Sequence, residues 1–268
     1  MMEILQFDFM IRAFIAGAAI AIIAPLVGIF LVVRRYALMA DTLAHVAFLG
    51  VVAGFLTGIS PFLAAIGTSV LAVFGIEKLR ANTRLPGDSL LALFLSGSLA
   101  IATVLISVSN GFNLNLFSFL FGSITTVSPS DLFIIIPFCI LVIFMILLLY
   151  KELFFISLDE ELAEANGIKT KILNTLIVVL AAFSVVVSIK IVGALLIGAL
   201  MVIPVLAAIQ FKCSFKFTII LSVVFSLLSV LVGIFVSYYL GTASGGAIVV
   251  IALIFFLLSM FLNKNQKI

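Results

Sequence analysis

Tryptophan is absent from this 268-residue chain, histidine occurs once, and charged residues make up only 9% of it. Apolar residues make up 65%, and 27 phenylalanines are spread along the whole length. So little polar surface excludes a soluble domain with a membrane anchor, and a net charge of +3 is too small to indicate nucleic-acid binding. The composition predicts an all-α, polytopic integral membrane protein with a single transmembrane domain over residues 1–268.

Several catalytic motifs are missing, and each absence removes a class of enzyme. A single histidine excludes an HExxH zinc protease, and without a GxxxxGK[ST] loop the chain does not hydrolyse ATP by that mechanism. Cys139 and Cys213 lie far apart with no CxxC spacing, so we predict neither a disulfide nor a metal site from them. The GDSL at 87–90 resembles a hydrolase motif, but Asp88 and Ser89 fit helix caps there. We expect a protein that is not an enzyme and holds no permanent cofactor.

Hydrophobic runs follow one another along the chain with short polar breaks between them. A hydrocarbon core about 30 Å thick needs roughly 20 apolar residues in a helix, so the sequence predicts about eight or nine transmembrane helices. The acidic start, MMEILQFDFMIRAF, lacks the basic region of a signal peptide and is expected to lead into a retained span. The runs are 9–33, 36–58, 61–79, 89–109, 130–150, 172–189, 191–210, 217–239 and 246–262.

Basic residues fall in alternate breaks between these runs. Lysine and arginine collect in short cytoplasmic loops, so the pattern predicts an external N-terminus and an internal C-terminus. Lys190 breaks the pattern, either because it snorkels at the external interface or because 172–210 is a re-entrant hairpin. The residues that follow the pattern are Arg34, Arg35, Lys78, Arg80, Arg84, Lys151, Lys169, Lys171, Lys212, Lys216, Lys264 and Lys267.

The longest polar interruption covers residues 151–171 and contains five of the eleven acidic residues. Asp159 is placed to cap a short helix, three glutamates follow in its first turns, and Gly167 supplies a C-terminal stop. We expect one or two helical turns lying across the cytoplasmic face. On the residues alone, this segment is either a solvated linker or a rigid surface for a soluble partner.

The stretch MADTLAHVAFLG, residues 39–50, places an aspartate and the lone histidine inside an apolar run. Asp41 and His45 are four residues apart, so in a helix they lie about 40° apart and roughly 6 Å along the axis. A carboxylate with an imidazole suits zinc or manganese, whereas calcium and magnesium prefer oxygen ligands only. The pair is a candidate metal site; a structural hydrogen-bonded Asp–His pair is the alternative.

The same run carries Gly50, Gly54 and Gly58, a small-xxx-small pattern that lets another helix approach closely. At 100° per residue these glycines centre about 180° from His45. An ionisable pair facing lipid costs several kcal/mol. We therefore expect the glycines to face a neighbouring helix and the Asp–His pair to face a pathway.

One histidine per chain limits the metal site that a single copy can build. Two ligands are too few for a selective tetrahedral site, but a two-fold dimer would bring two copies of Asp41 and His45 to its axis. A homodimer that shares the site is one hypothesis. As for function, the same pair would also suit a self-sufficient, proton-coupled secondary transporter, with Asp41 as the coupled carboxylate and His45 as its relay.

Several blocks in order resemble the membrane permease subunit of the ATP-binding-cassette importers for zinc, manganese and iron, most closely the zinc branch. The resemblance covers nearly the whole length of the chain. The blocks are RRYALMADTLAHVAFLGVVAG at 34–54, LFSFLFGSITTVSPSDL at 116–132, LDEELAEANG at 158–167, IKIVGALLIGALMVIPVLAA at 189–208 and ASGGAIVV at 243–250.

The resemblance implies a role for particular residues. Asp41 and His45 match the family's metal-coordinating motif on the second helix. The cytoplasmic loop at 151–171 matches the segment that docks on the ATPase subunit, with Asp159, Glu161, Ala163 and Gly167 at the matching positions. Gly193 and Pro204 match a block to which we assign no role beyond helix bending.

The resemblance also implies partners and a location: a second copy of the chain, a cytoplasmic ABC ATPase, an extracytoplasmic metal-binding protein, and the prokaryotic plasma membrane. Many relatives of the family have Ser and Pro at positions 44 and 49. This chain has Ala44 and Leu49 there, which resembles the zinc branch. This favours zinc as the transported ion over manganese. The external stretch 109–129 has no histidine or acid, so capture of the metal is expected to belong to the separate binding protein.

Overall fold

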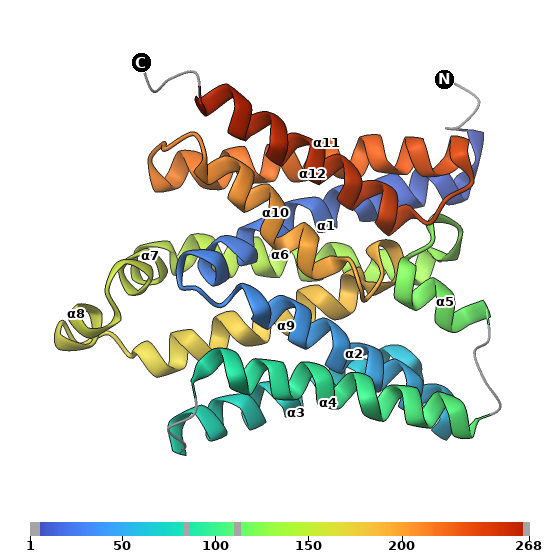
Figure 1. Ribbon diagram of the computed structural model, residues 1–268, viewed down its shortest axis with the longest axis horizontal. Helices are drawn as coiled ribbons and strands as arrows, with labels where there is room; N and C mark the ends of the chain where they lie inside the picture. Colours follow the sequence, from blue (N-terminus) through green and yellow to red (C-terminus); the bar gives the residue numbers. More distant parts are fainter. Residues whose placement is uncertain (1–5, 83–85, 110–113, 265–268) are drawn as a thin grey trace.

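The computed structural model describes residues 6–82, 86–109 and 114–264, and within these ranges it is helical with no strand. Eight helices are long and apolar enough to cross a membrane, and Figure 1 shows them running along the long axis of the molecule. This confirms the predicted all-α, polytopic fold. The eight are α1 (Asp8–Val33), α2 (Ala37–Thr57), α3 (Pro61–Asn82), α4 (Gly87–Val108), α6 (Pro129–Leu148), α9 (Thr170–Val192), α11 (Phe215–Leu240) and α12 (Ser244–Lys264).

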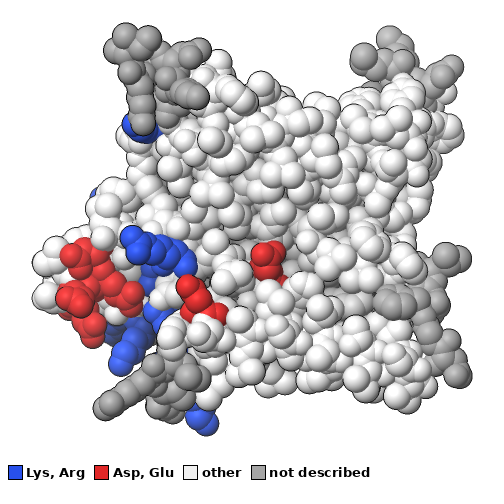
Figure 2. All heavy atoms as spheres, viewed as in Figure 1, with Lys and Arg blue, Asp and Glu red and all other residues white. Residues whose placement is uncertain are grey.

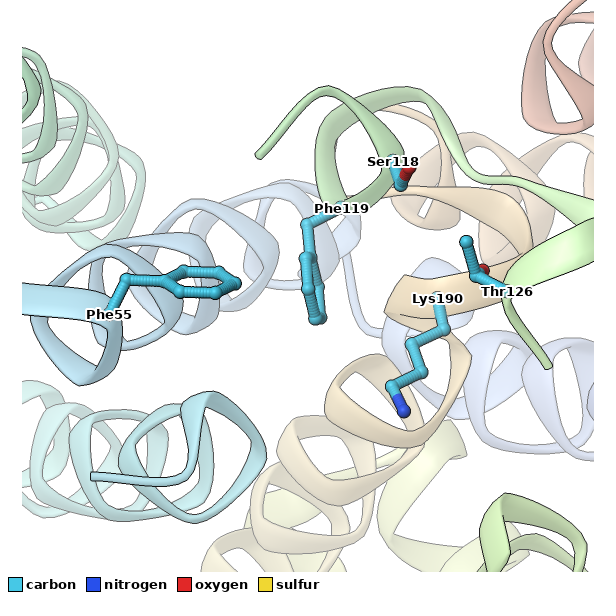
Figure 3. Close-up of a pocket in the computed structure, with 5 residues that line it drawn as sticks. All are labelled: Phe55, Ser118, Phe119, Thr126 and Lys190. Atoms are coloured by element: carbon cyan, nitrogen blue, oxygen red, sulfur yellow. The ribbon is translucent and has the colours of Figure 1, made fainter. Parts of the chain in front are cut away.

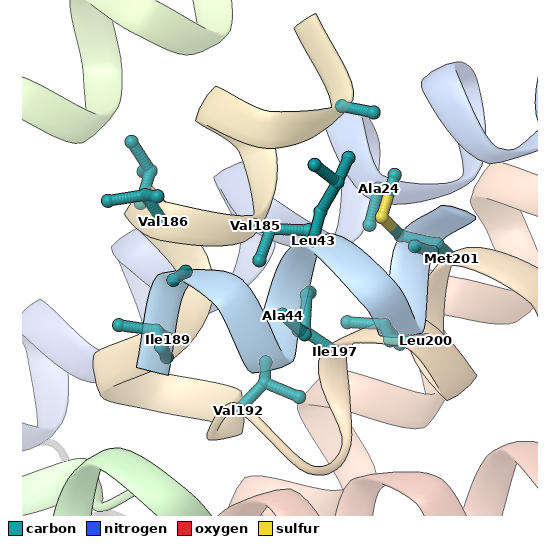
Figure 4. Packing of buried hydrophobic residues seen from close by; sticks show 14 of the residues in the cluster. Ala24, Leu43, Ala44, Val185, Val186, Ile189, Val192, Ile197, Leu200 and Met201 are labelled. Atoms are coloured by element: carbon teal, nitrogen blue, oxygen red, sulfur yellow. The ribbon is translucent and has the colours of Figure 1, made fainter. Parts of the chain in front are cut away.

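The long helices divide into an inner and an outer set. About two thirds or more of the membrane-spanning part of α1, α2 and α9 is buried, but less than a third of α3, α4, α6 and α12. Figure 4 shows Leu43 and Ala44 of α2 packed among Val185 of α9 and Ile197 and Leu200 of α10 (Ile197–Ile209). The outer helices turn side chains such as Phe133, which is 81% exposed, outward, as a lipid-facing surface requires.

The run 191–210 is not a full-length span. Its helix α10 has 13 residues, about 20 Å, because the chain first makes a turn at Gly193. In Figure 1 this turn lies inside the bundle, short of the right-hand ends of α2 and α11. The first of the two runs, α9, keeps the length of a span, and only the second is shortened, by the turn at Gly193. Lys190 binds Asp131 of α6, with Nζ and Oδ1 2.6 Å apart.

Two short helices that the sequence did not predict cover the turn. They are α5 (Leu114–Phe121) and the 3-10 helix η2 (Ile124–Thr126). The backbone N–H of Ala194 donates to Phe119 O at 2.8 Å, and that of Ser123 donates to Lys190 O at 3.0 Å. The backbone groups freed by the break between α9 and α10 are thereby satisfied inside the protein, as a membrane interior requires.

The charged end of the molecule carries the remaining short helices, α7 (Tyr150–Leu158) and α8 (Glu160–Ala165). Figure 2 shows Lys, Arg, Asp and Glu side chains gathered at this left-hand end, with one further acidic patch near the middle of the face. In Figure 1, α1 begins at the opposite end and α12 ends at this one, which is consistent with the predicted topology. Arg84 and Lys267 lie outside the described residues.

The predicted cap and stop of the short cytoplasmic helix are confirmed. Asp159 Oδ1 accepts the N–H of Leu162 at 3.0 Å, and Gly167 has φ +82° with its N–H donated to Glu164 O. The sequence did not separate α7 from the end of α6. The expected caps of the GDSL segment are wrong: α4 has Pro86 as its N-cap, so Asp88 and Ser89 lie inside the first turn.

Candidate metal pathway along helix α2

One face of α2 combines ionisable side chains with partial exposure. Asp41, His45 and Leu49 follow one another at four-residue spacing and are half-buried, while the residues between them are buried. The Asp41 carboxylate and the His45 imidazole are close enough to interact electrostatically. The structure thus brings together the two residues that the sequence proposed as metal ligands.

The two side chains are not bound to each other. Within the described residues, no hydrogen bond or ion pair joins Asp41 to His45, and the buried Nδ1 of His45 has no hydrogen-bond partner. A structural Asp–His pair would use this nitrogen or its ring partner to accept or donate such a bond. The hydrogen-bonded Asp–His pair that the sequence offered as an alternative is therefore not found among the described residues.

Gly198, in the first turn of α10, lies directly against Asp41. A Cβ atom at position 198 would stand 1.8 Å from Asp41 Oδ1, so any larger residue there would displace this carboxylate. The first turn of a helix carries the positive end of its dipole and backbone N–H groups without intrahelical partners. The sequence did not identify Gly198, although it stands in one of the quoted blocks.

The opposite face of α2 meets α3, and the three predicted packing glycines divide between two roles. A Cβ at Gly50 would lie 2.6 Å from Ala65 Cα, and one at Gly54 would lie 2.8 Å from Pro61 Cα. These two positions therefore let the backbones approach closely. Gly58 does not pack: a Cβ there would meet nothing within 4 Å, and its φ of +72° ends α2.

A pocket of about 240 Å³ lies at the other end of α2, beneath α5. Figure 3 shows Phe55 and Phe119 facing each other across it, with Ser118, Thr126 and Lys190 on the far wall. The two rings meet edge to face at 5.9 Å between centroids. Neither a carboxylate nor an imidazole lines this pocket, and the charge of Lys190 is paired with Asp131. The polar groups among the described lining residues are thus two hydroxyls and one ammonium group, a weak set of metal ligands.

The described residues contain no group of three or more His, Cys, Asp or Glu side chains placed to hold a metal ion. One chain thus contributes Asp41 and His45 alone to a site on α2. This is fewer than the four donors of a closed tetrahedral zinc site. A metal site here would need further donors from water, from backbone carbonyls or from a second copy of the chain.

The four residues assigned to the coupling loop have different surroundings. Glu161 is exposed on α8, while Ala163 is fully buried beneath it. Asp159 and Gly167 shape the two ends of the helix. The sequence did not single out Glu160, whose carboxylate binds Arg34 at 2.9 Å and Asn174 at 2.6 Å. These contacts join segments far apart in the sequence, so no local pattern indicates them.

Nearly the whole chain is similar to known membrane transport proteins, both in sequence and in structure. Residues 6–263 match the model of the ABC 3 transport family. The chain is 33% identical over 262 residues to the manganese import system permease protein ScaB of Streptococcus parasanguinis, covering 98% of this chain and 93% of the relative. It is 28% identical over 260 residues to the high-affinity zinc uptake system membrane protein ZnuB of Haemophilus influenzae, covering 97% and 100%. The solved structure of PsaBC from Streptococcus pneumoniae in complex with Fab has a TM-score of 0.87 at 32% identity, covering 96% of this chain and 93% of that one.

Proposed function

Because this chain belongs to the ABC 3 transport family, we propose that it is the permease through which an ATP-driven importer takes up zinc. The chain is a multi-pass plasma-membrane protein and a transport component, not an enzyme. Family membership establishes a metal importer permease. The choice of zinc over manganese is our proposal, since relatives of both names match.

One observation carries the assignment of the pathway. Asp41 and His45 share the half-buried face of α2, they are not bonded to each other, and the Nδ1 atom of His45 is buried without a partner. Oxygen with nitrogen donors is a set that suits a borderline divalent cation. Ala44 and Leu49, as in zinc-branch permeases, support zinc, and manganese is the second candidate.

The remaining parts of the transporter follow from what this chain lacks. Two copies of Asp41 and His45 at a two-fold axis would supply four donors, so we propose a homodimer. A separate ATPase would dock on residues 151–171, with Glu161 on the exposed side of α8. An extracytoplasmic binding protein would deliver the ion above the pocket between Phe55 and Phe119. The proton-coupled alternative has no support in the family of the chain.

His45→Ala tests the proposal most directly. In cells that lack their own importer and express the complete transporter, we expect Zn²⁺ uptake to fall on the order of 100-fold or more, because an outer partner of a ligand alone is worth 10–100-fold. Assembly with the ATPase should be unchanged. Thr57→Ala is the matched control, since this exposed hydroxyl at the end of α2 bonds only to Ala53 O. Wild-type uptake in His45→Ala would refute the site, and stronger competition by Mn²⁺ than by Zn²⁺ would refute the preference.

A further inference from the structure

Building on the proposed function, we propose that Glu160 is the positioning residue through which movement of α8 reaches Asp41. The two oxygens of its carboxylate bind residues of two different inner segments, Arg34 after α1 and Asn174 in α9. Oε2 binds the Arg34 guanidinium at 2.9 Å, and Oε1 accepts the Asn174 amide at 2.6 Å. Arg34 closes α1 and opens the turn into α2, while Asn174 lies in the first turns of α9. Glu160 therefore ties α8 to both helices at once.

Both branches of this fork lead to Asp41. Through Arg34 the contact reaches the turn before α2, and Asp41 stands in the first turns of that helix. Through Asn174 it reaches α9, which continues to the Gly193 turn and the start of α10, where Gly198 lies against Asp41. Packed helices move as rigid elements, so a shift of α8 changes both sides of the carboxylate together.

The turn between α1 and α2 is held in one conformation by contacts on each side. Tyr36 lies between the guanidinium groups of Arg34 and Arg80, 5.5 and 4.6 Å from its ring centre, and its hydroxyl also accepts a hydrogen bond from Arg80. Arg35, which lies between Arg34 and Tyr36 in the sequence, has φ +61°. This is a left-handed conformation that residues with a side chain disfavour, so surrounding contacts must maintain it. Loss of the Arg34 contact releases one of these restraints.

Glu160 differs from the other acids of α8 in having a buried partner, although its own side chain is 40% exposed. The Arg34 side chain is only 10% exposed, so Glu160 neutralises a guanidinium that is largely out of water. Glu161 and Glu164 are exposed, and no hydrogen bond or ion pair to another helix is found for either among the described residues. Among the described contacts of α8, the Glu160 carboxylate makes the polar links to α1 and α9. The exposed side of α8 is thus free for the ATPase, while Glu160 faces the bundle.

The test measures transport and ATP hydrolysis on the same sample. The permease and its ATPase are reconstituted in proteoliposomes with the binding protein, and uptake of radioactive Zn²⁺ is divided by ATP hydrolysed. For Glu160→Gln, which keeps an oxygen for Asn174 and removes the charge facing Arg34, we expect the ATPase to remain bound at the wild-type ratio. Ions moved per ATP should fall at least tenfold. Asp88→Asn, an exposed carboxylate in the first turn of α4 and outside the 151–171 loop, is the matched control and should keep the wild-type ratio.

Two further variants separate coupling from folding. Arg34→Lys keeps the charge without the guanidinium fork and should give an intermediate ratio of ions to ATP. Glu160→Arg combined with Arg34→Glu should recover part of the ratio that Glu160→Arg alone loses. An unchanged ratio in Glu160→Gln, or a loss of transport that follows loss of bound ATPase, overturns the proposal. Absence of Zn²⁺ and Mn²⁺ uptake by the wild-type complex would instead contradict the proposed function itself.

Discussion

The two ends of the inner helices are held by different chemistry. At the α8 end, side chains with charges make the contacts: Glu160 with Arg34, and Arg80 with Tyr36. At the α5 end, backbone packs against backbone, because a Cβ at Gly245 would lie 1.8 Å from Val192 O and one at Gly193 would lie 2.4 Å from Leu120 O. Charged contacts re-form after small shifts, whereas these glycine contacts leave no room. The α5 end is therefore the more tightly constrained of the two by close backbone packing.

The strongest way to break this contrast is to add a methyl group at the glycine-packed end. Gly245→Ala places a Cβ against Val192 O and should lower the free energy of unfolding by about 3 kcal/mol, the upper range for overpacking in a tight core. Thermal unfolding in detergent, followed by size-exclusion chromatography, measures the loss. Gly246→Ala is the matched control, because a Cβ at the next residue would meet nothing within 4 Å. Equal melting temperatures for the two variants would show that the turn is not rigid.

The second prediction concerns the contact between Gly198 of α10 and Asp41 of α2. Gly198→Ala forces the Asp41 carboxylate to move, since the new Cβ would overlap Oδ1. We expect Zn²⁺ uptake to fall roughly 10- to 100-fold, the range for loss of a partner that orients a metal ligand. Uptake assays with Gly67→Ala as control, where a Cβ meets open space, check this. Retained uptake in Gly198→Ala would mean that the position of Asp41 is not set by α10.

The smallest effect is expected where the α5 end does use charge. Lys190→Met removes the ammonium group that binds Asp131 Oδ1. The other oxygen, Oδ2, keeps its hydrogen bonds from the Ser128 N–H and hydroxyl at 2.9 and 2.8 Å. The free energy of unfolding should fall by about 1 kcal/mol. A double-mutant cycle with Asp131→Asn measures the coupling between the two side chains. A coupling energy near zero would show that α6 and α9 are held by packing alone.

Sequence reasoning performed well where one helix could be read by itself. The nine hydrophobic runs correspond to the eight long helices and α10 within a few residues, because burial in lipid demands a continuous apolar stretch. The cap at Asp159 and the stop at Gly167 were also visible, since both act within one helical turn. The placement of Asp41 and His45 on one face of α2 follows from helical spacing alone.

What the sequence could not show depends on contacts between distant segments. Gly58 belongs to the same four-residue series as Gly50 and Gly54, yet it ends the helix, and spacing does not separate a packing glycine from a terminal one. Gly198 acquires its role only because α10 starts beside Asp41. The partners of Glu160 come from residues 34 and 174. Short helices such as α5 and α7 carry too few residues for a periodic signal.

In the proposed pathway, the position of the first turn of α10 beside Asp41 affects how long an ion would stay bound to this carboxylate. The positive end of a helix offsets part of the charge on the Asp41 carboxylate, so this carboxylate holds a cation less tightly than an isolated one would. Weaker binding would be a disadvantage in a storage protein. In a transport pathway, however, binding at each site must be weak enough for the ion to leave. In the proposed pathway, the start of α10 beside Asp41 would therefore shorten the time that the ion stays bound there and favour its release.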